Sequence, residues 1–568
     1  MTDAVAIGIF LALTAWLGLR ASGAKTLKEY FTGGGNMPWH LAGLSMAATT
    51  FAADTPLAVT ELVRQHGVSG NWLWWNMMAG GMLTAVFFAR YWRRAGITTD
   101  VELVSIRYSG RAAKVLRLFK AVYFGLLLNA VVLGWVNLAL ASLLQAYFGI
   151  SYGAAFGWTC VAMLLTLVYT GAAGLKGVVW ADAAQFAVAM VGCVVLAVFA
   201  VQAAGGVDAL KARPGAVNFF PGEGGLTPGI GAFVAMLGVQ WWASWYPGNE
   251  PGGGGYISQR LIAAKNETHA RAAAFFFQFL HYAVRPWPWI LVALATVYLY
   301  PDLAPENYRM GYVFAMRDVL PDGLRSLLLV AFLAAYMSTV STHLNWGASY
   351  LTHDFLMPLR PEWKNPRRAA LWATGAVALA GLAAAAVSDS VSGAWRFLIE
   401  CGAGMGGVLI ARWYWRRVSA YSEIAAMAVP VVVFGLQKIW FVYVDGADDA
   451  TSFFVFPNTY FVTVAATTLA WVAAAFLLPQ TDEEVLRKFY EKVRPGGFWP
   501  PYSDPKRAIA PILKLKTGWI LATAAGYALL FATGKAALAE WTAAAGYFVA
   551  GMAGVAGAFF ILGNDDGQ

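Results

Sequence analysis

The feature that most constrains this chain is a succession of long apolar runs, each able to cross a lipid bilayer as a helix. A bilayer core about 30 Å thick needs roughly 20 apolar residues in helical form. Only 12% of the residues are charged, about half the share typical of soluble domains. We therefore expect an all-α polytopic membrane protein, embedded in lipid, with about 14–15 transmembrane helices. The candidate runs are 3–20, 38–62, 70–92, 118–147, 151–171, 179–204, 226–246, 272–299, 325–357, 368–388, 391–411, 421–443, 456–478, 517–533 and 541–562.

The charges of the loops predict which side of the membrane each loop faces. With the N-terminus outside, the loops that would lie inside are rich in lysine and arginine, as loops facing the cytoplasm usually are. Loops 93–117 and 479–516 are strongly basic, and 444–455, expected outside, is acidic. Arg260 is counted among the inside charges. We expect a multi-pass protein of a bacterial cytoplasmic membrane, and no nucleic-acid partner, because the net charge of +9 is explained by these loops.

The run Leu327–Leu356 is unusually polar at its centre. Four hydroxyl side chains lie there within five residues: Ser338, Thr339, Ser341 and Thr342. Hydroxyls alone are ordinary in membrane helices, where they bond to their own backbone or join neighbouring helices. Matching polar residues in three other runs favour ion sites that centre on this helix.

The run 38–62 carries Asp54, Thr55 and Pro56 near its middle. A charged side chain at that depth costs about 2.5–3.5 kcal/mol on insertion scales and usually faces a cavity or a partner. Pro56 removes a backbone donor. These residues favour a broken helix that exposes carbonyls to an ion and a helix end to a solute. The alternative is a simple proline kink in which Asp54 caps the second half.

Three further runs carry candidate polar residues. Asp182 lies about one turn into the run 179–204, where it either faces the bundle or answers the helix dipole. His281 and Arg285 are spaced for one helix face, with Gln278 nearby; a solute role and a snorkelling Arg285 are both open. Trp242 belongs to an aromatic cluster that either lines a solute path or forms an interfacial belt.

The glycine run Gly252–Gly255 follows this aromatic cluster. No Gly-Lys-Ser/Thr sequence comes after it, so a phosphate-binding loop is not indicated. We expect a flexible cytoplasmic loop.

Four stretches together resemble the sodium/solute symporter family: EYFTGGGNMPWHLAGLSMAA (29–48), GLKGVVWADAAQ (174–185), YISQRLIAAKN (256–266) and LAAYMSTVSTHLNWGASYLTHD (333–354). The resemblance implies a five-plus-five inverted-repeat helix bundle with broken helices. The segments expected on this basis are a leading helix in 1–25, the repeats 38–204 and 226–411, additional helices in 421–478, a cytoplasmic loop with an amphipathic helix in 479–516, and C-terminal transmembrane helices in 517–568.

The resemblance also implies sodium as the coupling ion. One sodium site would use the carbonyls of Ala48, Phe51 and Ala335 and the hydroxyls of Ser338 and Thr339. A second sodium, present in some members, would use Asp182, Ser341 and Thr342.

The solute positions match sugar-transporting members poorly. Asp54 and Thr55 stand where those members have Glu-Gln, and His281 stands where they have lysine. The residues expected to face solute are Asp54, Thr55, Trp242, Gln278 and His281.

We expect a sodium-driven symporter that moves a small organic solute into the cell by alternating access, and not an enzyme. The alternatives are a transporter-like solute sensor and a membrane-embedded transferase. A transferase would need a paired-carboxylate or histidine-rich face with a metal, and no loop of the sequence carries such a cluster.

Overall fold

A break in the middle of one helix sets the plan of the molecule. In the computed structural model, α3 (Trp39–Thr49) and α4 (Thr55–His66) are separated by the non-helical residues 50–54. Pro56 lies in the first turn of α4, where its missing N–H group has no helical partner to lose. The side chain of Asp54 makes no capping bond to α4. The expected break is therefore confirmed, and the alternative in which Asp54 caps the second half is wrong.

The structure describes residues 2–20, 26–222, 230–360, 366–387, 391–447, 452–454, 457–497, 499–503 and 505–563. Within these ranges the regular elements are helices, and eight helical segments are long and apolar enough to cross a membrane. This number is smaller than the number of expected spans because some spans are divided. The span expected at 226–246, for example, consists of short pieces: α13 (Ile230–Ala235), η5 (Met236–Gln240) and α14 (Trp241–Ala243).

Two other expected spans, 151–171 and 179–204, both lie within α11 (Tyr152–Ala203). At about 1.5 Å per residue, a straight helix of 52 residues would be far longer than a bilayer is thick. Gly174 interrupts the helix with φ 62° and ψ −171°. A Cβ atom there would lie 2.9 Å from the backbone oxygen of Tyr30, so this turn between two spans favours glycine.

The remaining helices follow in the order in which the chain builds the bundle. In the N-terminal half they are α1 (Thr2–Arg20), α2 (Leu27–Thr32), η1 (Gly33–Gly35), η2 (Val68–Asn71), α5 (Trp72–Trp75), α6 (Met78–Leu83), η3 (Thr84–Phe88), α7 (Ala89–Ala95), α8 (Leu103–Arg107), α9 (Gly110–Val122), η4 (Tyr123–Leu128), α10 (Asn129–Phe148) and α12 (Val207–Lys211). In the C-terminal half they are α15 (Gly255–Ala263), α16 (Glu267–Gln278), η6 (Phe279–Val284), α17 (Pro286–Leu299), η7 (Pro305–Met310), α18 (Gly311–Asp318), α19 (Asp322–Tyr350), η8 (Leu351–Leu356), α20 (Met357–Leu359), α21 (Pro366–Val387), α22 (Val391–Cys401), α23 (Met405–Tyr414), α24 (Ala420–Tyr443), α25 (Asn458–Leu477), α26 (Glu483–Val493), α27 (Pro505–Ala537) and α28 (Trp541–Gly563).

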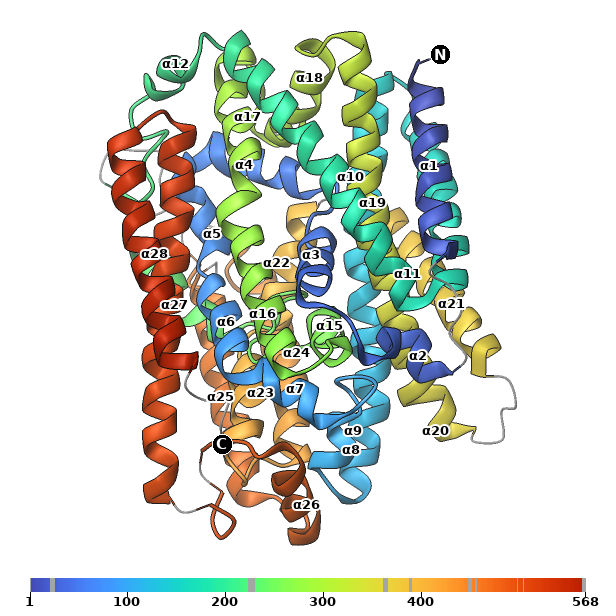
Figure 1. Ribbon diagram of the computed structural model, residues 1–568, viewed down its shortest axis with the longest axis vertical. Coiled ribbons are helices and arrows are strands. Elements are labelled where there is room, and N and C mark those ends of the chain that lie inside the picture. Colours follow the sequence, from blue (N-terminus) through green and yellow to red (C-terminus); the bar gives the residue numbers. More distant parts are fainter. Residues whose placement is uncertain are drawn as a thin grey trace.

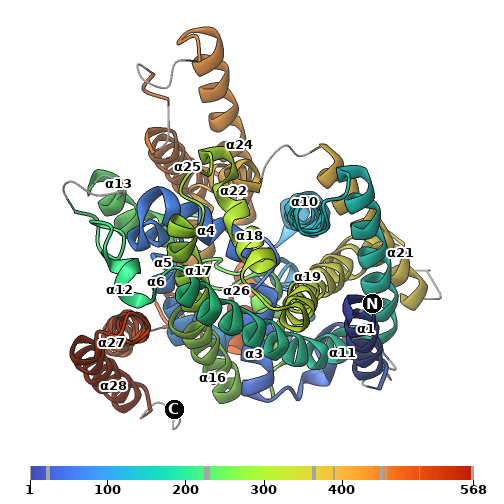
Figure 2. The same cartoon turned by 90° about the horizontal axis from the view of Figure 1, so that it is seen from above.

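The helix α19 lies near the centre of the bundle and carries the four hydroxyls. It packs against α11, α21, α10 and α3, and its central window is 89% buried. The pairs α24–α25 and α27–α28 lie at the periphery when the molecule is seen from above (Figure 2). Phe559 and Phe560 on α28 are more than three-quarters exposed, as expected for side chains that face lipid.

The amphipathic helix expected in the loop 479–516 is α26, at the end of the molecule opposite the N-terminus (Figure 1). It begins at Glu483 after Asp482, so a helix start capped by Thr481 is wrong. Its apolar side chains Leu486 and Phe489 are buried, and the helix packs against α7 and α8. The basic loop 93–117 therefore lies at the same end as the basic loop 479–516.

Candidate functional site

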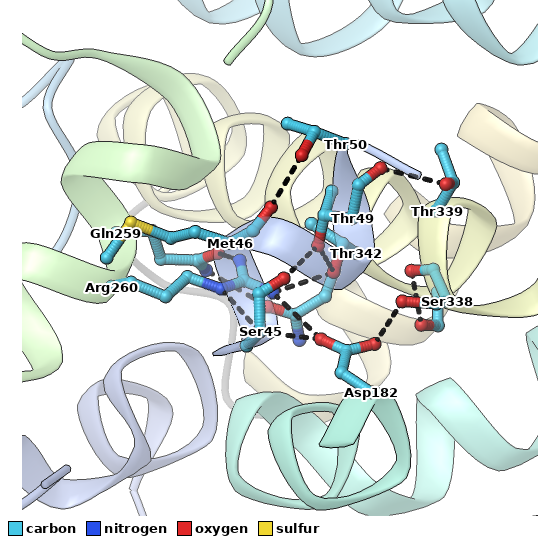
Figure 3. Close-up of polar contacts among 12 residues, drawn as sticks. Ser45, Met46, Thr49, Thr50, Asp182, Gln259, Arg260, Ser338, Thr339 and Thr342 are labelled. Atoms are coloured by element: carbon cyan, nitrogen blue, oxygen red, sulfur yellow. Dashed lines mark hydrogen bonds and ion pairs between the residues drawn. The ribbon is translucent and has the colours of Figure 1, made fainter. Parts of the chain in front are cut away.

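The broken helix α3–α4 and the central helix α19 meet at the level of the break. The Thr339 hydroxyl donates to the carbonyl of Thr49 at 2.8 Å. The hydroxyls of Thr49 and Thr342 are hydrogen-bonded at 2.9 Å (Figure 3). The two segments expected to share a sodium ion, 48–51 and 335–342, are thus in direct contact.

The last carbonyls of α3 point into this junction, where a helix presents its negative end. The carbonyl of Ala47 accepts from Arg285 Nη1 at 2.9 Å, and that of Ala48 accepts from the backbone N–H of Phe51 at 3.0 Å. The carbonyl of Thr49 accepts from Thr339. Ala48 and Phe51, two of the residues proposed to supply carbonyls, therefore lie at a helix end that attracts cations.

Asp182 on α11 is the hub of the hydrogen bonds beneath the junction. Its Oδ1 accepts from the Ser338 hydroxyl at 2.7 Å, and its Oδ2 accepts from the Ser45 hydroxyl at 2.6 Å. Arg260 Nη2 lies 3.6 Å from Oδ2, and both side chains are fully buried (Figure 3). Asp182 thus faces the bundle, and the alternative of an acid that only answers its own helix dipole is wrong.

The hydroxyls of Ser338 and Thr339 have a chemistry that suits a hard cation. Each uses its single proton in a hydrogen bond, Ser338 to Asp182 and Thr339 to the Thr49 carbonyl. Their oxygen lone pairs are therefore available as acceptors. Neutral oxygen atoms of this kind, with helix carbonyls, are the ligands that hard cations prefer. Ala335, the remaining member of the predicted first sodium set, is buried one turn before Thr339 on α19.

Arg260 was counted among the inside loop charges, and the structure corrects this: its side chain is fully buried. It lies on α15, one residue after Gln259, whose Oε1 accepts from Arg260 Nη1 at 2.8 Å. Arg260 Nη2 also donates to the Thr342 hydroxyl at 2.7 Å. A guanidinium group therefore already contacts two members of the predicted second sodium set, Asp182 and Thr342. The third, Ser341, donates back to the Ser338 carbonyl at 3.0 Å.

A cavity of about 100 Å³ adjoins the break. Asp54, Thr55 and His281 line it, as expected for residues that face solute, together with Thr339 of the predicted sodium set. Its other lining residues are Thr49, Thr50, Ala52, Ala58, Val59, Leu62, Leu73, Trp74, Met77, Val132, Trp135, Val136, Tyr246, Pro247, Asn249, Tyr256, Arg285, His343, Trp395 and Ile399.

Two opposite charges on the cavity wall lack an ion-pair partner among the described residues. Arg285 is 1% exposed and does not snorkel; its Nη1 donates to the Thr50 hydroxyl at 2.7 Å, and its Nη2 lies 2.8 Å from His281 Nδ1. Asp54 is 3% exposed, and its Oδ1 has no hydrogen-bond partner. Buried charges are costly unless they are paired, so this cavity is suited to a charged or strongly polar guest.

Trp242 and Gln278 lie outside the lining of this cavity. The Trp242 indole donates to the carbonyl of Gly238 on its own helix, and Gln278 borders a second, smaller cavity. Of the aromatic cluster, Tyr246 contributes to the large cavity instead. A composition of aromatic residues indicates a cluster but not which ring turns inward, because the chain after Ala243 is no longer helical.

Comparisons with known proteins agree with this architecture. The human sodium/iodide cotransporter is 26% identical over 394 residues, which cover 66% of this chain and 59% of that protein. The sodium/glucose cotransporter of Vibrio parahaemolyticus is 24% identical over 384 residues, 62% of this chain and 68% of that protein. The chain thus spans less than two thirds of the length of the human relative that it matches.

A solved structure of a Na⁺-coupled sialic acid symporter, in a substrate-bound outward-open state, matches with a TM-score of 0.65 at 17% identity. The match covers 85% of this chain and 99% of that one, and it supports the five-plus-five inverted-repeat bundle. The model of the sodium:solute symporter family matches residues 30–429. The chain therefore belongs to the sodium:solute symporter family.

Proposed function

We propose that this protein is a sodium-driven symporter that carries a small organic solute into the cell by alternating access. The observation that carries the proposal is the junction of Thr339 with the Thr49 carbonyl, which places hydroxyl and carbonyl oxygens beside the cavity. We further propose that the protein lies in a bacterial cytoplasmic membrane with its N-terminus outside, because this orientation puts the basic loops inside.

The first sodium ion would bind between the carbonyls of Ala48, Phe51 and Ala335 and the hydroxyls of Ser338 and Thr339. Asp182 supports this site through Ser338, because a hydroxyl that donates to a carboxylate presents a more negative oxygen to the ion. Sodium moving down ~100 mV gains ~2.3 kcal/mol, and a tenfold gradient adds ~1.4 kcal/mol. One ion per cycle thus supports roughly 10²–10³-fold accumulation of a neutral solute.

A second sodium ion at Asp182, Ser341 and Thr342 would raise this limit to roughly 10⁵-fold, since the two driving energies add. Arg260 would first have to leave Thr342, because a fixed guanidinium group there repels an incoming cation. The two stoichiometries are separated by the reversal potential of uptake.

The solute that fits the cavity charges is a small zwitterion. A cationic group would pair with the unpartnered Oδ1 of Asp54, and a carboxylate would pair with Arg285, which prefers planar oxygen pairs. Both buried charges would then be compensated within one cavity. A neutral sugar would leave both charges unpaired.

Uptake into proteoliposomes, with and without an inward sodium gradient, tests the symporter proposal. Accumulation that depends on the gradient supports it. Solute binding without accumulation would support the sensor, and neither binding nor accumulation of any solute tested would leave the transferase as the better account.

A thermal-shift screen of solutes in sodium, repeated in potassium, tests the zwitterion proposal. We expect amino acids and related zwitterions to raise the melting temperature in sodium only, since a ligand stabilises the state that it binds. Asp54→Asn and Arg285→Gln should each reduce that shift while Glu484→Gln, on the exposed side of α26, should not. Stabilisation by neutral sugars, but not by zwitterions, would refute the proposed solute class.

A further inference from the structure

Glu250 is a buried carboxylate that the proposed sodium and solute sites do not use. It is 3% exposed and lies in the non-helical segment between α14 and α15. Its Oε2 accepts from the backbone N–H of Gly248 at 3.1 Å. Its Oε1 has no hydrogen-bond partner, and no ion pair joins Glu250 to a base within the described ranges. A carboxylate in this state is stable only if it is protonated or faces a cation.

The glycine run expected to be a flexible loop is wrapped around this carboxylate. A Cβ atom on Gly255 would lie 2.7 Å from Glu250 Oε1, and one on Gly253 would lie 2.8 Å from Trp92 Nε1. Both glycines have positive φ, 56° and 80°, which L side chains rarely adopt. The segment is therefore packed tightly, and glycine at these positions lets the backbone approach the glutamate.

A small cavity of about 10 Å³ lies against Glu250. Gln278 lines it with a second buried oxygen, Oε1, that has no hydrogen-bond partner. Thr84 also lines it, and its hydroxyl donates to the Gly80 carbonyl at 3.1 Å, which leaves the oxygen lone pairs available. Thr84 begins the π-helical turn η3, and Gln278 directly precedes the π-helical turn η6; such turns are frequent at functional sites.

We propose that this cavity, the Glu250 pocket, binds one small hard cation of the size of sodium. The oxygen atoms of Glu250, Gln278 and Thr84 are ligands that suit such an ion. A volume near the lower limit for one water molecule, about 10–15 Å³, has no room for an organic ammonium group. The carboxylate supplies the negative charge that the predicted first sodium site lacks.

The pocket is placed to communicate with the solute cavity. Asn249 lines both cavities, and the adjacent Gly253 approaches Trp92 on α7. The pocket therefore lies between the solute cavity and the end of the bundle that carries α7 and α26. A role for this ion in transport rests on the proposed symport, whereas its binding does not.

Equilibrium binding of radioactive sodium to the purified full-length protein, in potassium-balanced buffer, tests the proposal. The parent should bind one more sodium ion per chain than Glu250→Gln. Thr84→Val keeps the side-chain shape and the carboxylate, and it should weaken this one ion by roughly tenfold, the value of one hydrogen bond or ligand contact. Glu400→Gln is the matched control, since Glu400 is also buried but is bonded by Thr459 and does not line the pocket.

Equal sodium stoichiometry and affinity in the parent, Glu250→Gln and Thr84→Val would overturn the proposal, and would indicate a protonated Glu250. Thr84→Val keeps the test valid if Glu250→Gln does not fold. If Ser338→Ala loses a sodium ion and Glu250→Gln loses none, the Glu250 pocket is refuted while the proposed symport stands. If the parent binds no sodium at all, both proposals fail.

Discussion

Replacing Asp182 with asparagine should destabilise the protein by about 3–5 kcal/mol, the usual cost of breaking a buried ion pair. The carboxylate is fully buried 3.6 Å from Arg260 Nη2 and accepts hydrogen bonds from Ser45 and Ser338. Hydrogen bonds to a charged group are worth about 1.5–3 kcal/mol and neutral ones about 0.5–1.5 kcal/mol, so these two bonds lose about 2 kcal/mol together. The uncompensated charge of Arg260 accounts for the rest.

A double-mutant cycle separates the ion pair from the other contacts. Arg260→Gln should also be destabilising alone, because it leaves Asp182 without its base. The variant carrying both changes has no buried charge, so it should be more stable than the sum of the single effects by about 2–3 kcal/mol. The measurement is denaturant or thermal unfolding of the four proteins in detergent, in potassium and again in sodium.

Two results would refute this reasoning. Single effects that add within about 0.5 kcal/mol would mean that Arg260 does not compensate Asp182. The sodium series gives the second test, because an ion at 100 times its Kd stabilises the folded state by about 2.7 kcal/mol. If Asp182→Asn loses that increment while Ser338→Ala retains it, Asp182 binds the ion directly instead of acting through Ser338.

Two further predictions follow from contacts on α19 and near α26. Ser338→Ala and Thr339→Ala should each raise the sodium concentration for half-maximal uptake by roughly tenfold, whereas Ser349→Ala, whose hydroxyl bonds back to the Trp346 carbonyl, should leave it unchanged; equal values in all three would remove the first sodium site. Arg107→Ala should destabilise the protein by about 3 kcal/mol and open the segment after α26 to limited proteolysis, because Arg107 donates to the Arg412 carbonyl and lies 4.9 Å from the Trp499 ring; an unchanged cleavage pattern would refute that link.

The broken helix was predictable because its cause is local. Asp54 and Pro56 interrupt an apolar run, and the chain between α3 and α4 is non-helical at that point. The hydroxyls of α19 were predictable as a cluster for the same reason. Their pairing with the end of α3 depends on contacts about 290 residues apart, which the family resemblance supplied and the spacing of residues within one run did not.

Arg260 was missed as a site residue because loop charge and buried charge are identical in composition. The sequence places it between an apolar run and a lysine, where most arginines lie at the membrane surface. The structure begins a new helix, α15, five residues before it and turns the guanidinium group inward. The available signal was the Gln259–Arg260 pair, since Gln259 is the acceptor that orients the arginine. Glu250 was missed similarly, because glycine-rich sequence usually indicates flexibility and here indicates close packing.

The arrangement of Arg285 suggests how sodium and solute binding become coupled. Its guanidinium group caps the end of α3 by donating to the Ala47 carbonyl, one residue before the Ala48 carbonyl proposed for sodium. A fixed positive charge so near that site weakens cation binding. A solute carboxylate at Arg285 would compensate this charge and strengthen the binding of sodium. Because coupling between two ligands is reciprocal, sodium would strengthen the binding of that solute by the same factor, and a solute without a carboxylate would gain nothing from sodium through this route.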